Sequence, residues 1–151
     1  MVNSKTISVN RKAYHDYDIL ESLEAGIVLT GTEIKSIRAG RVNIRDAYAR
    51  PEGGELWLVN AHIAAYEAGS RYNHEPNRPR KLLLHRRQIN QLVGMATRKG
   101  LTLVPLKLYI KRGVAKLELG VARGKRLHDK REAMARRETD REIERALKRE
   151  S

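Results

Sequence analysis

The sequence predicts a mainly β protein: a closed antiparallel barrel of about six short strands with two or three flanking helices, followed by a basic C-terminal tail. Three observations predict this fold class. Apolar and polar residues alternate in several short segments, a helical repeat occurs in only two, and the C-terminal end is dense in charge with few large apolar side chains. With 151 residues, the chain has room for one such barrel, residues 1–122, and a tail, residues 123–151.

The clearest strand is expected at residues 17–29, where one face of alternating residues is apolar. Gly26 within this strand suggests a bend or a bulge. A short helix is expected next, because Thr30 and Glu33 have capping-box spacing and each side chain can satisfy a free backbone N–H at the helix start. Gly40 is a typical end for this helix.

Further short strands are expected at residues 46–50, 55–59 and 62–66. Residues 51–54 contain a proline and two glycines and are predicted to form the turn between the first two. The polar segment 67–80 is expected to be a loop.

A strand at residues 81–84 is expected to lead into a second helix at residues 86–99. One apolar stripe at helical spacing predicts this helix: Ile89, Leu92, Val93 and Ala96. A final hairpin pairs residues 101–110 with residues 114–122. Pro105 has no N–H to donate to a ladder, so we expect it at an edge or a bulge. Such a set of strands and helices is typical of an oligonucleotide-binding (OB) barrel.

The last segment of the chain has a different pattern. Residues 129–150 are rich in strong helix formers, but their few large apolar side chains cannot dock a helix on the barrel. We expect a frayed or disordered tail that becomes helical on an anionic partner.

The charge of the chain indicates a nucleic-acid partner. Lysine and arginine number 31 against 18 acidic residues, which gives a formal net charge of +13 and a pI near 10.3. The absence of cysteine excludes disulfides and thiolate metal sites. Because no apolar run is long enough to span a membrane, we expect a soluble, cytoplasmic protein.

Two segments have the composition of RNA contacts. Residues 10–17 combine two cations and a histidine with two tyrosines, which can stack on unpaired bases. They can also be a solvated approach to a strand, with Tyr17 in the core. A nuclease site at His15 and Asp16 is disfavoured, because neighbours in a strand point to opposite faces. Residues 73–81 form a proline-stiffened loop with three cations, and they either contact phosphate or are simply polar.

Glu24 is expected on the polar face of its strand, where it is either solvated or accepts hydrogen bonds from a base edge or a ribose hydroxyl. Lys35 and Arg38 extend the positive surface around the first helix. The histidines have no spacing that specifies a metal, and no glycine-rich motif cradles a phosphate.

Nine segments in one colinear order resemble the SmpB (small protein B, or SsrA-binding protein) family. They are residues 10–13, 15–17, 24–26, 31–38, 73–76, 80–85, 100–106, 124–126 and 129–131. The resemblance implies an OB-type barrel that binds the tRNA-like part of transfer-messenger RNA (tmRNA) and delivers it to stalled bacterial ribosomes, without catalysis. It places Tyr17, Glu24, Leu83 and His85 on the RNA surface. It also places residues 124–126 and His128 at the decoding centre, with the tail in the vacant mRNA channel.

Together, composition and resemblance select two groups of residues. The predicted tmRNA contacts are Asn10, Arg11, Lys12, His15, Tyr17, Glu24, Lys35, Arg38, Asn73, Arg78, Arg80, Lys81, Leu83 and His85. The predicted ribosome contacts are Gly124, Lys125, Arg126, His128, Asp129, Lys130 and Arg131. We expect a monomer with no cofactor and no metal. The alternative is a general RNA chaperone or ribosomal protein of the same fold.

Overall fold

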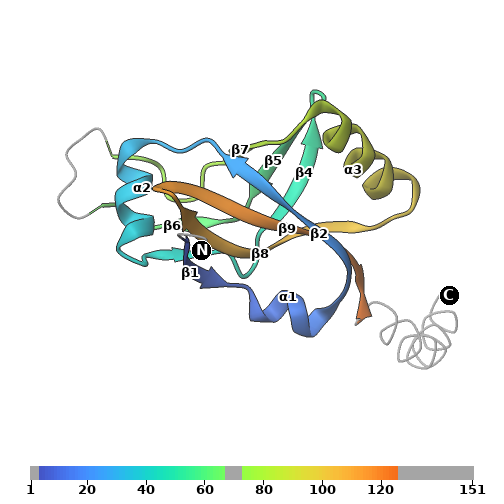
Figure 1. The fold of residues 1–151 in the computed structure, drawn as a ribbon, viewed down its shortest axis with the longest axis horizontal. Coiled ribbons are helices and arrows are strands. Elements are labelled where there is room, and N and C mark those ends of the chain that lie inside the picture. The colour runs from blue at the N-terminus through green and yellow to red at the C-terminus, as the bar shows by residue number, and fades with distance from the viewer. Residues whose placement is uncertain (1–3, 67–72, 126–151) are drawn as a thin grey trace, which may run out of the picture.

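The computed structural model describes residues 4–66 and 73–125 (Figure 1). This part of the chain contains nine strands: β1 Ser4–Val9, β2 Tyr17–Ile27, β3 Val42–Asn43, β4 Tyr48–Glu52, β5 Glu55–Val59, β6 His62–Ile63, β7 Arg80–Leu83, β8 Thr102–Lys111 and β9 Val114–Gly124. It also contains three helices: α1 Arg11–Asp16, α2 Gly31–Arg38 and α3 Arg86–Arg98. The fold of the tail beyond Lys125 lies outside the described residues.

Seven strands form one antiparallel sheet in the order β1-β8-β9-β2-β7-β5-β4, and β3 pairs with β6 apart from it. The mainly β prediction is confirmed, but the expected closed barrel is not found. Within the described residues no ladder joins the edge strands β1 and β4. The sheet curls until β4 lies beside β8. Because β8 already pairs with β1 and β9, it has no free edge to bond β4.

The long strand β2 runs through the middle of the molecule and matches the alternation expected there (Figure 1). Its bulge lies at Leu20, where the ladder with β9 shifts register, and not at Gly26. Gly26 has another role. A Cβ at this position would come within 3.2 Å of the Leu83 Cβ, so the absence of a side chain lets β2 and β7 lie close together without displacing Leu83.

The start of the chain differs from its expected form. Residues 10–17 were expected to approach β2 as an extended segment, but they contain α1. Asn10 caps this helix through its side-chain oxygen, which accepts a bond of 3.1 Å from the Ala13 backbone N–H. β1 was also not predicted, because it is a largely exposed edge strand in which apolar and polar residues alternate little.

Several local predictions are confirmed. Thr30 and Glu33 form both bonds of the capping box, with Glu33 N donating to Thr30 Oγ1 at 3.3 Å and Thr30 N donating to Glu33 Oε1 at 2.8 Å. The β8–β9 ladder shifts register beside Pro105, as expected at a bulge. The strand expected at residues 62–66 is shorter, since only β6 pairs there, with β3.

The core contains the apolar stripe expected on α3 together with buried residues of α2 and the sheet. Its large buried members include Ile37, Leu56, Leu58, Leu82, Ile89, Leu92, Leu117 and Leu119. At about 25 cal/mol per Å² of apolar surface removed from water, this burial is the main stabilising contribution.

One buried ion pair crosses this core. Glu33 on α2 and Arg80 on β7 are both fully buried, and Arg80 Nε donates to Glu33 Oε2 at 2.7 Å. Arg80 also donates to the carbonyls of Ala61 and Pro76, each at 2.9 Å. Arg78 adds a second cation, with its Nη2 2.7 Å from Glu33 Oε1. Burial alone would raise the pKa of Glu33, but the bonds from Arg78, the Thr30 N–H and Arg80 hold that pKa below its usual value.

Replacing Glu33 with glutamine is expected to lower the free energy of unfolding by about 3–5 kcal/mol, because the buried Arg80 loses its counter-charge. Glu52→Gln is the matched control, since Glu52 forms an exposed ion pair with Arg50. It should cost less than about 1 kcal/mol. Urea unfolding at neutral pH measures both values, and equal values would show that the buried pair contributes no more to stability than an exposed one.

The lowered pKa of Glu33 determines how the free energy of unfolding changes with pH. Because the folded pKa of Glu33 lies below its unfolded value of about 4.3, its stabilisation is fully present above that pH and is lost as the pH falls through the folded pKa. Wild-type stability should therefore fall more steeply than that of Glu33→Gln between about pH 5 and pH 3. Urea unfolding across this range is the measurement, and parallel curves would show that Glu33 is not the group responsible.

Candidate nucleic-acid interface

The outer face of β2, β9 and β8 presents a carboxylate among tyrosine and lysine side chains. Tyr109 of β8 reaches across β9, and its hydroxyl donates to Glu24 Oε2 at 2.6 Å. Lys111 Nζ lies 3.5 Å from the same oxygen. Glu24 stays 38% exposed, so it remains accessible to a ligand.

The electrostatics keep Glu24 ionised. The hydrogen bond from Tyr109, followed by the charges of Lys111 and Lys116, holds the pKa of Glu24 below its usual value. Burial and the bond to Glu24 raise the pKa of Tyr109, so its hydroxyl remains a donor. Both bonds to Glu24 use Oε2, and Oε1 can therefore accept a hydrogen bond from outside.

Glu24 also borders a shallow groove, which we call the Glu24 groove, lined by Leu83, His85, Gln88 and Lys116 as well. Leu83 is 50% exposed because Arg80 and Leu82 take the inward positions of β7. His85 is held at the start of α3, where its backbone N–H donates to Gln88 Oε1 at 3.0 Å. The groove thus brings together three predicted site residues, Glu24, Leu83 and His85.

Four predicted site residues make contacts that hold the fold. Asn10 is 2% exposed and Arg80 is fully buried, so neither offers a surface to RNA. Asn73 Nδ2 donates to the Tyr66 carbonyl at 2.8 Å, and Arg78 is bound to Glu33. From composition alone, both arginines are expected on the surface. The sequence does not reveal their partner Glu33, which is more than 40 residues away along the chain.

The cations of α1 are exposed and lie at the other end of β2, since Tyr17 and Glu24 are separated by about 23 Å of extended strand. Arg11 is exposed, and Lys12 Nζ lies 2.8 Å from Asp46 Oδ1. His15 Nδ1 and Asp16 Oδ1 lie 2.9 Å apart, so the expectation that these side chains diverge was wrong. That expectation assumed a strand, whereas the residues belong to a helix.

The other predicted contacts lie on separate surfaces. Lys35 Nζ lies 5.5 Å from the Tyr66 ring, and Arg38 donates to the Gly113 carbonyl at 3.3 Å. Lys81 Nζ lies 4.0 Å from Glu55 Oε2. At the end of β9, Gly124 pairs with Tyr17, and Lys125 Nζ lies 3.9 Å from Asp18 Oδ1. Arg126, His128, Asp129, Lys130 and Arg131 lie outside the described residues.

Sequence reasoning missed the partners of Glu24. Tyr109, Lys111 and Lys116 were not selected, although Tyr109 and Lys116 occupy outward positions of the two predicted hairpin strands. Gln88, which lines the groove, was not selected either. Because side chains alternate along a strand, Tyr109 faces outward where its neighbour Leu108 is buried. Examining that outward set for an aromatic residue among cations would have found the site.

No group of three metal-ligating side chains gathers anywhere in residues 4–66 and 73–125. In the same part of the chain, none of the helices has the length and apolar character required to cross a membrane.

A curled antiparallel sheet that holds a tyrosine–carboxylate pair among lysines, beside a groove with an exposed leucine and histidine, favours a small RNA-binding protein of the mainly β class. The chain belongs to the SmpB family, because the family model described as "SmpB protein" matches residues 7–149.

Individual relatives support this membership. The chain is 65% identical over 144 residues to the "SsrA-binding protein" of Carboxydothermus hydrogenoformans, covering 95% of this chain and 97% of that protein. It is 64% identical to the "SsrA-binding protein" of Geobacillus kaustophilus, covering 95% and 93%. A chain of the solved structure described as "tmRNA-SmpB: a journey to the center of the bacterial ribosome" is 57% identical, with a TM-score of 0.66, over 78% of this chain and 83% of that chain.

Replacing Tyr109 with phenylalanine is expected to raise the pKa of Glu24 towards its ordinary value, because the largest influence lowering it is the Tyr109 hydrogen bond. Tyr14→Phe removes a hydroxyl from an exposed tyrosine of α1 and serves as the control. A carbon-13 NMR titration of the side-chain carboxyl measures the pKa. If Tyr109→Phe leaves it unchanged, the bond has no electrostatic effect.

Proposed function

We propose that this protein is a tmRNA-binding adaptor of trans-translation. It binds the tRNA-like domain of tmRNA and delivers it to stalled ribosomes, and it catalyses no reaction itself. Membership of the SmpB family supports this function, as do the names of relatives that are more than 60% identical over nearly the whole chain. It acts as a monomer in the bacterial cytoplasm, where translation takes place.

The observation that carries the proposal is the Glu24 groove beside the Tyr109–Glu24 pair. Lysines alone attract any RNA through its phosphates and give no selectivity. A fixed carboxylate is different, because it accepts hydrogen bonds from base edges or ribose hydroxyls and repels phosphate. The exposed Leu83 and His85 offer surfaces on which unpaired bases of a folded RNA loop can pack.

The curled sheet serves as an OB-type RNA-binding body, and its last strand leads into the second functional part. β9 ends at Gly124, followed by Lys125. From this joint, residues 126–151 enter the decoding centre and the vacant mRNA channel, where Arg126, His128, Asp129, Lys130 and Arg131 contact ribosomal RNA. The tail carries a net positive charge, which suits a channel walled by phosphates.

Replacing Glu24 with alanine is expected to weaken binding of the tRNA-like domain about tenfold, since hydrogen bonds to charged groups contribute about 1.5–3 kcal/mol. Glu21→Ala removes the same charge from an exposed position on β2 and is the matched control. Bulk electrostatics predicts tighter binding for both variants. Filter binding at physiological salt, with bulk tRNA as competitor, is the measurement.

Two results would contradict the proposal. If Glu24→Ala bound the tRNA-like domain as tightly as Glu21→Ala does, the carboxylate would not recognise RNA. If the wild type bound tRNA and tmRNA equally, with an affinity that only followed salt, a general RNA chaperone would be the better description.

Ending the chain after Lys125 is expected to leave binding of the tRNA-like domain within about twofold of wild type but to abolish tagging of stalled peptides. This end point is preferable to removing Gly124, because Gly124 pairs with Tyr17 in the β2–β9 ladder. A reconstituted translation assay on an mRNA without a stop codon measures tagging. Loss of RNA binding on truncation would refute the division between body and tail.

A further inference from the structure

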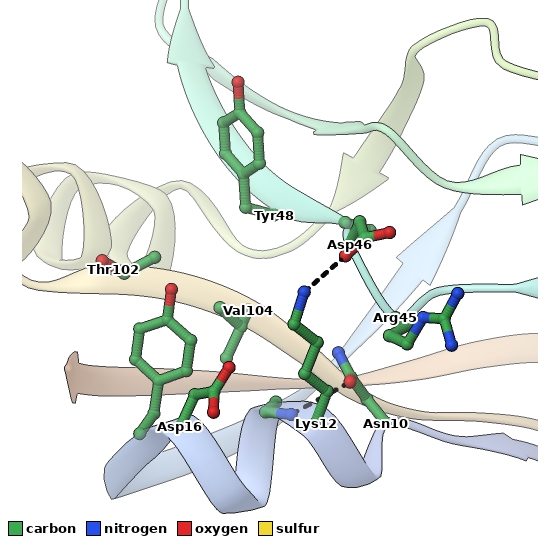
Figure 2. Close-up of a pocket in the computed structure, with 11 residues that line it drawn as sticks. Asn10, Lys12, Asp16, Arg45, Asp46, Tyr48, Thr102 and Val104 are labelled. Atoms are coloured by element: carbon green, nitrogen blue, oxygen red, sulfur yellow. Dashed lines mark hydrogen bonds and ion pairs between the residues drawn. The ribbon is translucent and has the colours of Figure 1, made fainter. Parts of the chain in front are cut away.

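A second hollow lies at the far end of β2 from the Glu24 groove, between α1, the segment before β4 and the first residues of β8 (Figure 2). We call it the α1 cleft. Its apolar base is formed by Ala13, Ala47 and Val104, which are each at most 4% exposed. An apolar base below a polar rim is the usual construction of a site for a flat heterocycle.

Two tyrosines from different elements line the cleft. Tyr17 lies at the junction of α1 and β2, and Tyr48 begins β4. Tyr48 is 36% exposed although it adjoins this apolar base, and Tyr17 is half-buried. Partly exposed rings beside a hollow are the arrangement that stacks unpaired bases.

Asn10 holds the cleft in its shape. Its Nδ2 donates to the Ile44 carbonyl at 3.1 Å and to the Pro105 carbonyl at 2.8 Å, while its Oδ1 accepts from the Ala13 N–H. One buried amide therefore joins α1, the segment before β4 and β8, which are the three elements around the cleft. A site fixed in this way does not have to be ordered when a ligand binds.

An exposed ion pair lies at the rim of the cleft. Lys12 Nζ bonds Asp46 Oδ1 at 2.8 Å across the mouth, and Arg45 stands next to Asp46 (Figure 2). The Lys12 and Asp46 side chains are 51% and 61% exposed, so this ion pair is weak and a phosphate can take its place on Lys12. Thr102 and Asp16 supply a hydroxyl and a carboxylate to the same cleft.

We propose that the α1 cleft binds an unpaired nucleobase of RNA, stacked on Tyr48 beside Tyr17, with the adjoining phosphate on Arg45 and Lys12. Thr102 meets the polar edge of the base. The inference rests on the proposed function for the choice of RNA over other anions. The base belongs either to the tRNA-like domain or to ribosomal RNA, since the cleft adjoins Tyr17, whose ladder partner Gly124 ends β9 directly before the segment proposed to enter the ribosome.

The first experiment tests the cleft itself with adenosine 5′-monophosphate, independently of any RNA preference. Ring-current shifts of the Tyr17 and Tyr48 resonances are expected on titration of the folded wild type, followed by NMR. Tyr48→Leu keeps an apolar side chain and should abolish the saturable shift at Tyr17, whereas Tyr48→Phe keeps the ring and should retain it. Tyr14→Leu is the matched control, because Tyr14 is 42% exposed on α1 and does not line the cleft.

The second experiment identifies the source of the base. Affinities of the same variants are measured for the tRNA-like domain and, separately, for small ribosomal subunits. Tyr48→Leu should lose about tenfold in one of the two, within the range for one stacked base, and Tyr48→Phe should recover it. The RNA for which the affinity falls is the one that supplies the base.

The proposal is overturned if Tyr48→Leu matches Tyr14→Leu with the nucleotide and with both RNAs, or if Tyr48→Phe is as weak as Tyr48→Leu. A different result would contradict the proposed function: the wild-type protein would bind bulk tRNA as tightly as it binds the tRNA-like domain. The nucleotide titration distinguishes the two, because it detects the cleft whichever RNA the protein prefers.

Discussion

The buried ion pair between Glu33 and Arg80 is the constraint on which the candidate surface depends. Arg80 is the first residue of β7, and its buried guanidinium donates to Glu33 and to the carbonyls of Ala61 and Pro76. This anchor sets which residues of β7 face inward. Leu82 then enters the core and Leu83 faces outward, whereas a slip by one residue would exchange them and remove the apolar wall of the Glu24 groove.

β2 connects this anchored region to the rest of the molecule. Its Glu24 end meets β7 and α3 at the groove, and its Tyr17 end meets α1 and the last residue of β9. Gly26 lets β7 approach closely, and the bulge at Leu20 changes the register with β9 between the two ends. One strand therefore carries two surfaces of different chemistry, a carboxylate among lysines at one end and a tyrosine-lined cleft at the other.

Most of the sheet could be predicted from the sequence, since its buried strands alternate clearly, as residues 17–29 and the final hairpin do. β1 could not be predicted, because an exposed edge strand does not need to alternate apolar with polar residues. The capping role of Asn10 could not be predicted either, because the pattern of residues 10–17 indicated an extended segment. Within the candidate site, Glu24, Leu83 and His85 were selected from the sequence, but Arg80 was also assigned to the surface. Its burial depends on a carboxylate distant in sequence, and only the folded chain brings the two together.

We propose that a defined surface around Glu24, rather than the positive charge as a whole, recognises one folded RNA. Amide chemical shifts of the isotope-labelled protein, recorded during titration with the tRNA-like domain at physiological salt, test it most directly. The largest changes are expected at Glu24, Leu83, His85 and Tyr109. Changes that are weak there, and spread evenly over exposed lysines and arginines elsewhere, would contradict it.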